Sequence, residues 1–108
     1  MQSKTRLGAV GQRSAVLALK ALGMQVYPTV TAEETARALH TLQKQGVNIV
    51  FITEKEAMEA SEAVERYRSD YAFSIIPIPG TNGSLGYGME SIRRNVEKAL
   101  GADILFNK

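Results

Sequence analysis

Strand-like and helix-like segments alternate along this chain of 108 residues, and this alternation constrains the fold more than any other feature. Within residues 48–52, the four residues that follow Asn48 are all apolar, a pattern typical of a parallel strand that is covered on both faces. Shorter apolar runs predict further strands. The expected strands are residues 7–10, 26–28, 48–52 and 74–78. Strands that alternate with helices predict an α/β fold with an open, mostly parallel sheet and helices on both faces.

Local signals mark where the helices begin and end. Thr31 and Glu34 have the spacing of a capping box, and Thr53 and Glu56 repeat it. Gly23 is expected to be the C-cap of the first helix. The expected helices span residues 14–22, 31–46, 53–70 and 89–100.

Two prolines indicate the order of the strands in the sheet. Pro cannot donate to a hydrogen-bond ladder, so Pro28 and Pro77 mark the second and fourth strands as sheet edges. With right-handed crossovers the strand order becomes 2-1-3-4, a small doubly wound sheet. We therefore expect a Rossmann-like or receiver-like unit at residues 1–78. A glycine- and proline-rich joint and a partner-binding helix follow at 79–108, within a single structural domain.

Composition excludes several classes of function. The net charge of +2 creates no strong field for nucleic acid. The chain has no cysteine, which removes thiol catalysis and disulfides and fits a cytoplasmic protein. No apolar run approaches the roughly twenty residues needed to span a bilayer, so no direct membrane insertion is expected.

The glycine-rich segment after the fourth expected strand resembles a phosphate-binding loop in its order of parts. Gly83 and Gly88 have the spacing of the two glycines in a Walker A loop. That loop needs a Lys followed by Ser or Thr, and the chain has Met89 and Glu90 at those positions. We therefore expect no cofactor. A small nucleotide- or phosphate-sensing domain that uses the loop at residues 80–88 remains the alternative.

Other catalytic and metal sites also lack their residues. The only histidine, His40, is expected at the solvated rim of the second helix, with no partner at ligand spacing. Receiver-type phosphotransfer needs acidic residues after the first and third strands, and the only aspartates are Asp70 and Asp103. The third helix carries a run of glutamates that we interpret as a solvated face: Glu54, Glu56, Glu59, Glu62 and Glu65. No catalytic or metal residue is predicted.

The last expected helix has one apolar face. Its stripe consists of Met89, Ile92, Val96 and Leu100. An ordinary crossover helix packed on the sheet would show the same periodicity, but it would usually need only a short connection. The long glycine-rich lead-in favours an arm that holds a partner. The first helix, residues 14–22, is also apolar nearly all round, which indicates either deep burial or a second partner surface.

These segments together resemble a known family, the F subunit of the V-type and archaeal A-type rotary ATPases. The strongest segments are Ile-Ile-Pro-Ile-Pro-Gly at 75–80 and Gly-Ser-Leu-Gly-Tyr-Gly-Met-Glu-Ser-Ile-Arg at 83–93. Shorter ones lie at 9–11, 20–28 and 50–54, and the resemblance covers about residues 5–103. The chain departs from the family at Gln12, where such sequences often carry an acidic residue.

The resemblance implies a non-catalytic part of the central rotor. The F subunit of that family docks on the coiled-coil D subunit, within the catalytic A/B ring, and its last helix is implicated in regulating ATP hydrolysis. The complex would hold this chain at the membrane peripherally. Carried onto this sequence, the partner-binding residues are Gly86, Tyr87, Met89, Ile92, Arg93, Val96 and Leu100.

Overall fold

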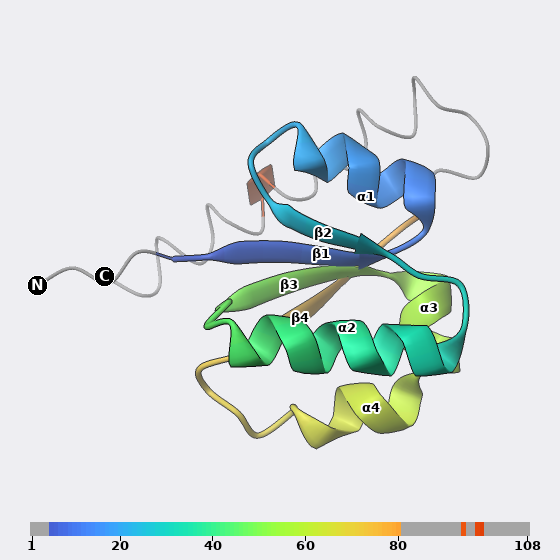
Figure 1. Ribbon diagram of the computed structural model, residues 1–108, viewed down its shortest axis with the longest axis vertical. Coiled ribbons are helices and arrows are strands. Elements are labelled where there is room, and N and C mark those ends of the chain that lie inside the picture. The colour runs from blue at the N-terminus through green and yellow to red at the C-terminus, as the bar shows by residue number, and fades with distance from the viewer. Residues whose placement is uncertain (1–4, 81–93, 95–96, 99–108) are drawn as a thin grey trace, which may run out of the picture.

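The computed structural model describes residues 5–80, 94, 97 and 98, and it contains a parallel sheet flanked by helices (Figure 1). Of the predicted last helix, therefore, only residues 94, 97 and 98 are described. The elements in chain order are β1 (Leu7–Gly11), α1 (Arg13–Lys20), β2 (Gln25–Pro28), α2 (Ala32–Lys44), β3 (Ile49–Thr53), α3 (Glu54–Glu59), α4 (Ser61–Arg66) and β4 (Ser74–Ile78). The described elements confirm the predicted α/β fold.

The strand order is β2-β1-β3-β4, and each neighbouring pair is parallel, as the two prolines predicted. Phe51 of β3 lies opposite Ala9 of β1 on one side and Ile76 of β4 on the other. All five residues of β3 are buried, which confirms that this strand is covered on both faces. The two central strands, β1 and β3, therefore form the rigid middle of the sheet.

Both edge prolines lie where a missing N–H group costs the sheet nothing. The amide of Thr29 donates to β1 at 2.8 Å, and the amide of Ser74 donates towards β3 at 2.8 Å. Because successive residues of a strand point their backbone groups to opposite sides, Pro28 and Pro77 turn theirs away from the sheet. The hydrogen-bond ladders to β1 and β3 therefore lose nothing, and each exposed edge of the sheet has one outward-facing N–H group fewer.

Helices cover the two faces unequally. Helix α1 packs on one face, and α2 and α4 pack on the other (Figure 1). The cluster on the α1 face is Ala9, Ala15, Val16, Leu19, Met24, Ile49, Phe51 and Ile78. The cluster on the opposite face is Val10, Ala38, Leu39, Leu42, Val47, Val50, Ala60, Ala63 and Phe73. Alternation along β1 and β3 sends neighbouring side chains into different layers, so one sheet supports both cores.

The first two helices differ from prediction mainly at their ends. Helix α1 ends at Lys20 rather than at residue 22, and Gly23 follows with a φ of +89°, so the predicted glycine turn comes after a shorter helix. The capping box of α2 is confirmed. The amide of Glu34 donates to the Thr31 hydroxyl at 3.1 Å, and the Glu34 carboxylate accepts from the Thr31 amide at 3.3 Å.

The prediction of one continuous third helix was wrong. It is divided into α3 and α4 at Ala60, which has φ −106° and ψ 33°. The backbone hydrogen bonds continue through the bend, because the Ala60 amide donates to the Glu56 carbonyl and the Ala60 carbonyl accepts from the Val64 amide. Figure 1 shows α3 near the end of the sheet and α4 alongside α2, so the chain changes direction between them.

Candidate functional site

All the predicted partner-binding residues lie outside the described part of the chain. They are Gly86, Tyr87, Met89, Ile92, Arg93, Val96 and Leu100. The described residues 94, 97 and 98 are helical and exposed, as predicted for the polar face of that helix. What the structure positions is the start of the joint at Pro79 and Gly80, and the end of the sheet from which it leaves.

A crevice of about 300 Å³ opens at this carboxyl end of the sheet. It lies where β1 leads to a helix on one face and β3 to helices on the other, the switch point at which doubly wound sheets usually bind ligands. The residues that line it are Gln12, Thr53, Glu54, Lys55, Glu56, Pro79 and Gly80. Both halves of the sheet and the start of the joint thus meet at one place.

The Thr53 hydroxyl joins β1 to α3 across the crevice. It accepts from the backbone N–H of Gln12 at 3.0 Å and donates to the Glu56 carboxylate. The second predicted capping box is therefore wrong, since Thr53 makes no side-chain cap to its own helix. The amide of a residue 41 positions earlier in the chain bonds the hydroxyl instead.

Glu56 also corrects the prediction of a fully solvated acidic face. Its side chain is only 7% exposed, whereas the other four glutamates of that run are exposed. Its contact with Thr53 supplies the partner that a buried carboxylate requires. A carboxylate fixed in the crevice repels a bound phosphate, so the electrostatics of this end disfavour an anionic ligand.

Gln12 contacts the first glycine of the joint. A Cβ atom on Gly80 would lie 2.7 Å from Gln12 Oε1, so the end of the Gln12 side chain would have to shift to admit a larger residue there. The residue at which the chain departs from the family pattern is therefore packed against the point where the joint begins.

The remaining predictions concern metal, membrane and the first helix. Within the described ranges, no group of three or more His, Cys, Asp or Glu side chains could hold a metal ion, and His40 is exposed. The same ranges contain no helix with the length and apolar character that crossing a bilayer requires. Helix α1 buries Ala15, Val16 and Leu19 but leaves Leu17 exposed on its outer face, and Leu22, just past the end of the helix, is exposed as well.

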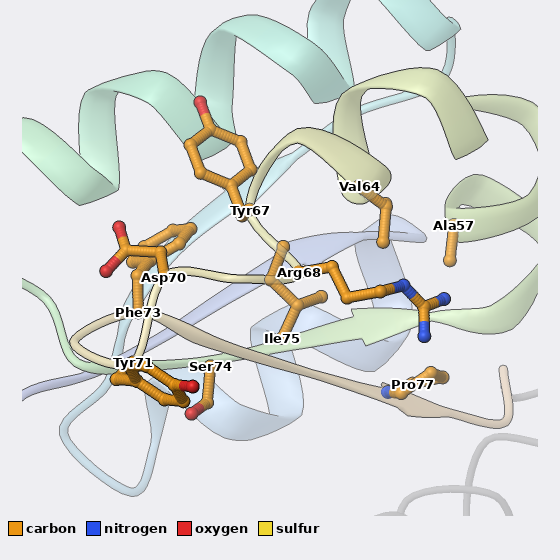
Figure 2. A pocket seen from close by; sticks show the side chains of 10 residues that line it. All are labelled: Ala57, Val64, Tyr67, Arg68, Asp70, Tyr71, Phe73, Ser74, Ile75 and Pro77. Carbon is orange, nitrogen blue, oxygen red and sulfur yellow. The ribbon is translucent and has the colours of Figure 1, made fainter.

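Sequence reasoning missed a second hollow, an open groove of about 480 Å³ between α4 and the outer strand β4 (Figure 2). On its rim the Arg68 guanidinium bonds Glu65 and holds the pKa of that carboxyl below its ordinary value. Tyr71 also lines this groove, and its side chain is fully exposed. A large aromatic residue in a connecting loop was the only signal in the sequence.

Comparison with known proteins decides the family. The family model described as the ATP synthase (F/14-kDa) subunit matches residues 7–96. The chain belongs to the family of the ATP synthase (F/14-kDa) subunit. The match runs from the first residue of β1 into the predicted last helix, so the family includes the segment beyond the described sheet.

Three relatives of this family member are each named as the F subunit of a V-type ATP synthase. One from Clostridium botulinum is 42% identical over 100 residues, covering 93% of this chain and 97% of the relative. One from Clostridium perfringens is 39% identical over 105 residues, covering 97% of this chain and all of the relative. One from Fusobacterium nucleatum is 35% identical with the same coverage. These relatives confirm the resemblance to the F subunit of the V-type ATPases.

Proposed function

We propose that this chain is the F subunit of a V-type ATPase, a non-catalytic part of the central stalk that docks on the coiled-coil D subunit. The observation that carries the proposal is the family match over residues 7–96, together with relatives named as the V-type ATP synthase F subunit along nearly their whole length. In this role the chain turns within the catalytic A/B ring and supports rotational coupling for ion transport. It also regulates ATP hydrolysis, and it is cytoplasmic, peripheral to the membrane through the complex.

The geometry of the sheet end suits a rigid body that carries an arm. The joint leaves from the switch point, where Gln12 packs against Gly80 and the Thr53 hydroxyl ties β1 to α3. An arm anchored at this cross-linked end of the sheet would transmit force to the whole domain. A partner held by the arm would therefore be coupled mechanically to the domain.

The arm is the proposed docking element. Burying the apolar stripe Met89, Ile92, Val96 and Leu100 on a coiled coil would contribute roughly 1.5–3 kcal/mol per side chain before association costs. Arg93 and Lys98 would meet acidic residues at the rim, and Gly86 and Tyr87 would lie in the joint. The exposed polar positions Arg94 and Glu97 are consistent with one free face of that helix.

The alternative, a nucleotide- or phosphate-sensing domain, loses support at the same end of the sheet. Glu54 and Glu56 line the crevice beside Gly80, and they outnumber the one basic residue there, Lys55. Titration calorimetry with ATP and ADP, with and without magnesium, tests this alternative directly. Micromolar binding to the isolated chain would favour it over the stalk proposal.

Co-purification with the D subunit tests the proposal. The double variant Ile92→Asp with Val96→Asp places charges on the apolar stripe and is expected to abolish co-purification while the sheet stays folded. The matched control is Arg94→Asp, which lowers the net charge by the same two units at an exposed position and is expected to retain the complex. Wild-type recovery of the coiled-coil partner by the first variant would show that this docking face is wrong.

A further inference from the structure

The outward face of α1 combines two cations with one leucine. Arg13, Leu17 and Lys20 are exposed, and they stand four and three residues apart, so they share one side of the helix. We call these three residues the α1 strip. The inner side of the same helix is buried in the core, and α1 covers its face of the sheet apart from α2 and α4 (Figure 1). Leu22, just past the helix, adds a second exposed apolar side chain.

No carboxylate of the described chain neutralises the two cations of the strip. Neither Arg13 nor Lys20 forms an ion pair within the described ranges, where the salt bridge that does form joins Arg68 to Glu65. The sequence supplies no acidic residue nearby either, because the first one along the chain is Glu33, in α2 on the other face of the sheet. The strip therefore presents two unpaired positive charges around a leucine.

The position of Arg13 is unfavourable for its own helix. Arg13 is the first residue of α1, and the first turn contains no acidic residue. The helix dipole disfavours a cation at this end and favours an anion. A carboxylate from outside the domain would thus be stabilised both by Arg13 and by the dipole. A local rule that is broken without compensation inside the fold is expected where a surface has a function.

Charge complementarity selects an acidic partner for the strip. Basic segments that bind anionic lipids carry roughly four to eight cations, so two cations do not suit a membrane surface. The chain's own expected last helix brings three basic residues against two acidic ones, namely Arg93, Arg94 and Lys98 against Glu90 and Glu97, so its net charge repels the strip. The helices of coiled coils often carry glutamates beside their apolar positions, and that pattern matches the strip.

We propose that the α1 strip docks against one helix of the coiled-coil D subunit, with carboxylates of that helix beside Arg13 and Lys20 and an apolar side chain against Leu17. The inference rests on the proposed function and adds a contact on the sheet domain to that of the arm. A spacing of four and three residues is the one at which two neighbouring helices meet along their faces. Charged pairs at such a contact determine its orientation and register.

Reversal of the two charges tests the electrostatic part. The double variant Arg13→Glu with Lys20→Glu is expected to raise the Kd for the D subunit about tenfold at low salt, and the difference from wild type should shrink as salt screens these exposed charges. The control is Lys44→Glu with Arg66→Glu, which makes the same change in net charge at exposed positions of α2 and α4 and should change Kd by less than about twofold. An unchanged Kd in the first variant, or equal increases in both, would overturn the inference.

Thiol labelling of the full chain shows what covers α1. The chain has no cysteine, so one introduced thiol reports on one surface. Ala21→Cys places a thiol at an exposed position beside the strip and keeps both cations, and Ser61→Cys is the control at an exposed position of α4. We expect a water-soluble maleimide to label the thiol at position 21 rapidly in the free chain and at least about tenfold more slowly with saturating D subunit. The thiol at position 61 should react at the same rate in both states.

The labelling outcomes separate the possible occupants. Slow labelling at position 21 in the free chain at every concentration would assign the strip to the chain's own residues 81–108, and slowing only at high concentration would assign it to a second copy. Either result would overturn the inference. Rapid labelling in the chain bound to the D subunit would overturn the strip contact and keep the arm. Failure of wild type to bind the D subunit would overturn the proposed function as well.

Discussion

A Cβ atom on Gly11 would lie 2.0 Å from Oγ1 of Thr53, so the central strands β1 and β3 meet here with no room for a side chain. Gly11 also has a φ of +127°, a conformation that L residues rarely adopt. This close approach brings the next amide, that of Gln12, to the Thr53 hydroxyl. The glycine therefore makes possible the cross-link at the end of the sheet.

Replacing Gly11 by Ala is expected to cost roughly 2–5 kcal/mol of unfolding free energy, because backbone strain and a steric clash add. The matched control is Gly23→Ala. Gly23 has a φ of +89° but nothing within 4 Å of its Cβ position, so only the strain of about 1–2 kcal/mol applies. Urea denaturation of both variants measures the difference. Equal losses would mean that the contact with Thr53 relaxes freely.

The variant Thr53→Val is expected to destabilise the fold by about 1–3 kcal/mol, because the Gln12 amide loses its acceptor and the buried Glu56 loses its donor. Thr53→Ser keeps the hydroxyl and should lose less. Chemical denaturation of the two variants separates the hydrogen bonds from the packing of the methyl group. A serine variant as unstable as the valine variant would contradict the proposed role of the hydroxyl.

Acid should weaken the start of α2. The backbone N–H groups of Val30 and Thr31 donate to the Glu34 carboxylate and, with the charge of Arg37, hold its pKa below the ordinary value of 4.5. Since the folded state favours the ionised form, this stabilisation is present above pH 4.5 and is lost as the pH falls through the lowered pKa. The urea midpoint of wild type should therefore fall more steeply below pH 4.5 than that of Glu34→Gln. Parallel acid profiles for the two proteins would contradict this assignment.

The sheet could be predicted because its signals are local. A fully apolar strand and two prolines determine which strands are central and which are edges, and neither depends on distant residues. The capping boxes show where local reasoning stops. Thr31 and Thr53 have the same spacing to a glutamate, yet only Thr31 forms the box, because the Thr53 hydroxyl bonds an amide from another strand.

The bend between α3 and α4 and the groove beside β4 could not be predicted from the sequence, because both depend on tertiary structure. The backbone hydrogen bonds continue through Ala60, and its neighbours keep the helical spacing of buried residues, so no periodicity marks the turn between α3 and α4. The groove beside β4 requires residues from Ala57 to Pro77 to meet in space. The arm was argued from sequence, and its apolar residues lie outside the described chain, so that part stays a prediction.

The last prediction concerns the protected edge of the sheet. Replacing Pro77 by Thr would restore an outward-facing N–H in β4 without disturbing its ladder to β3, and exposed edges with a full set of donors pair with other chains. We expect greater self-association than wild type at high concentration, measured by sizing with light scattering. Pro79→Thr makes the same chemical change just past the end of the strand and should not associate. If Pro77→Thr is no more associated than wild type, the missing donor is not what protects this edge.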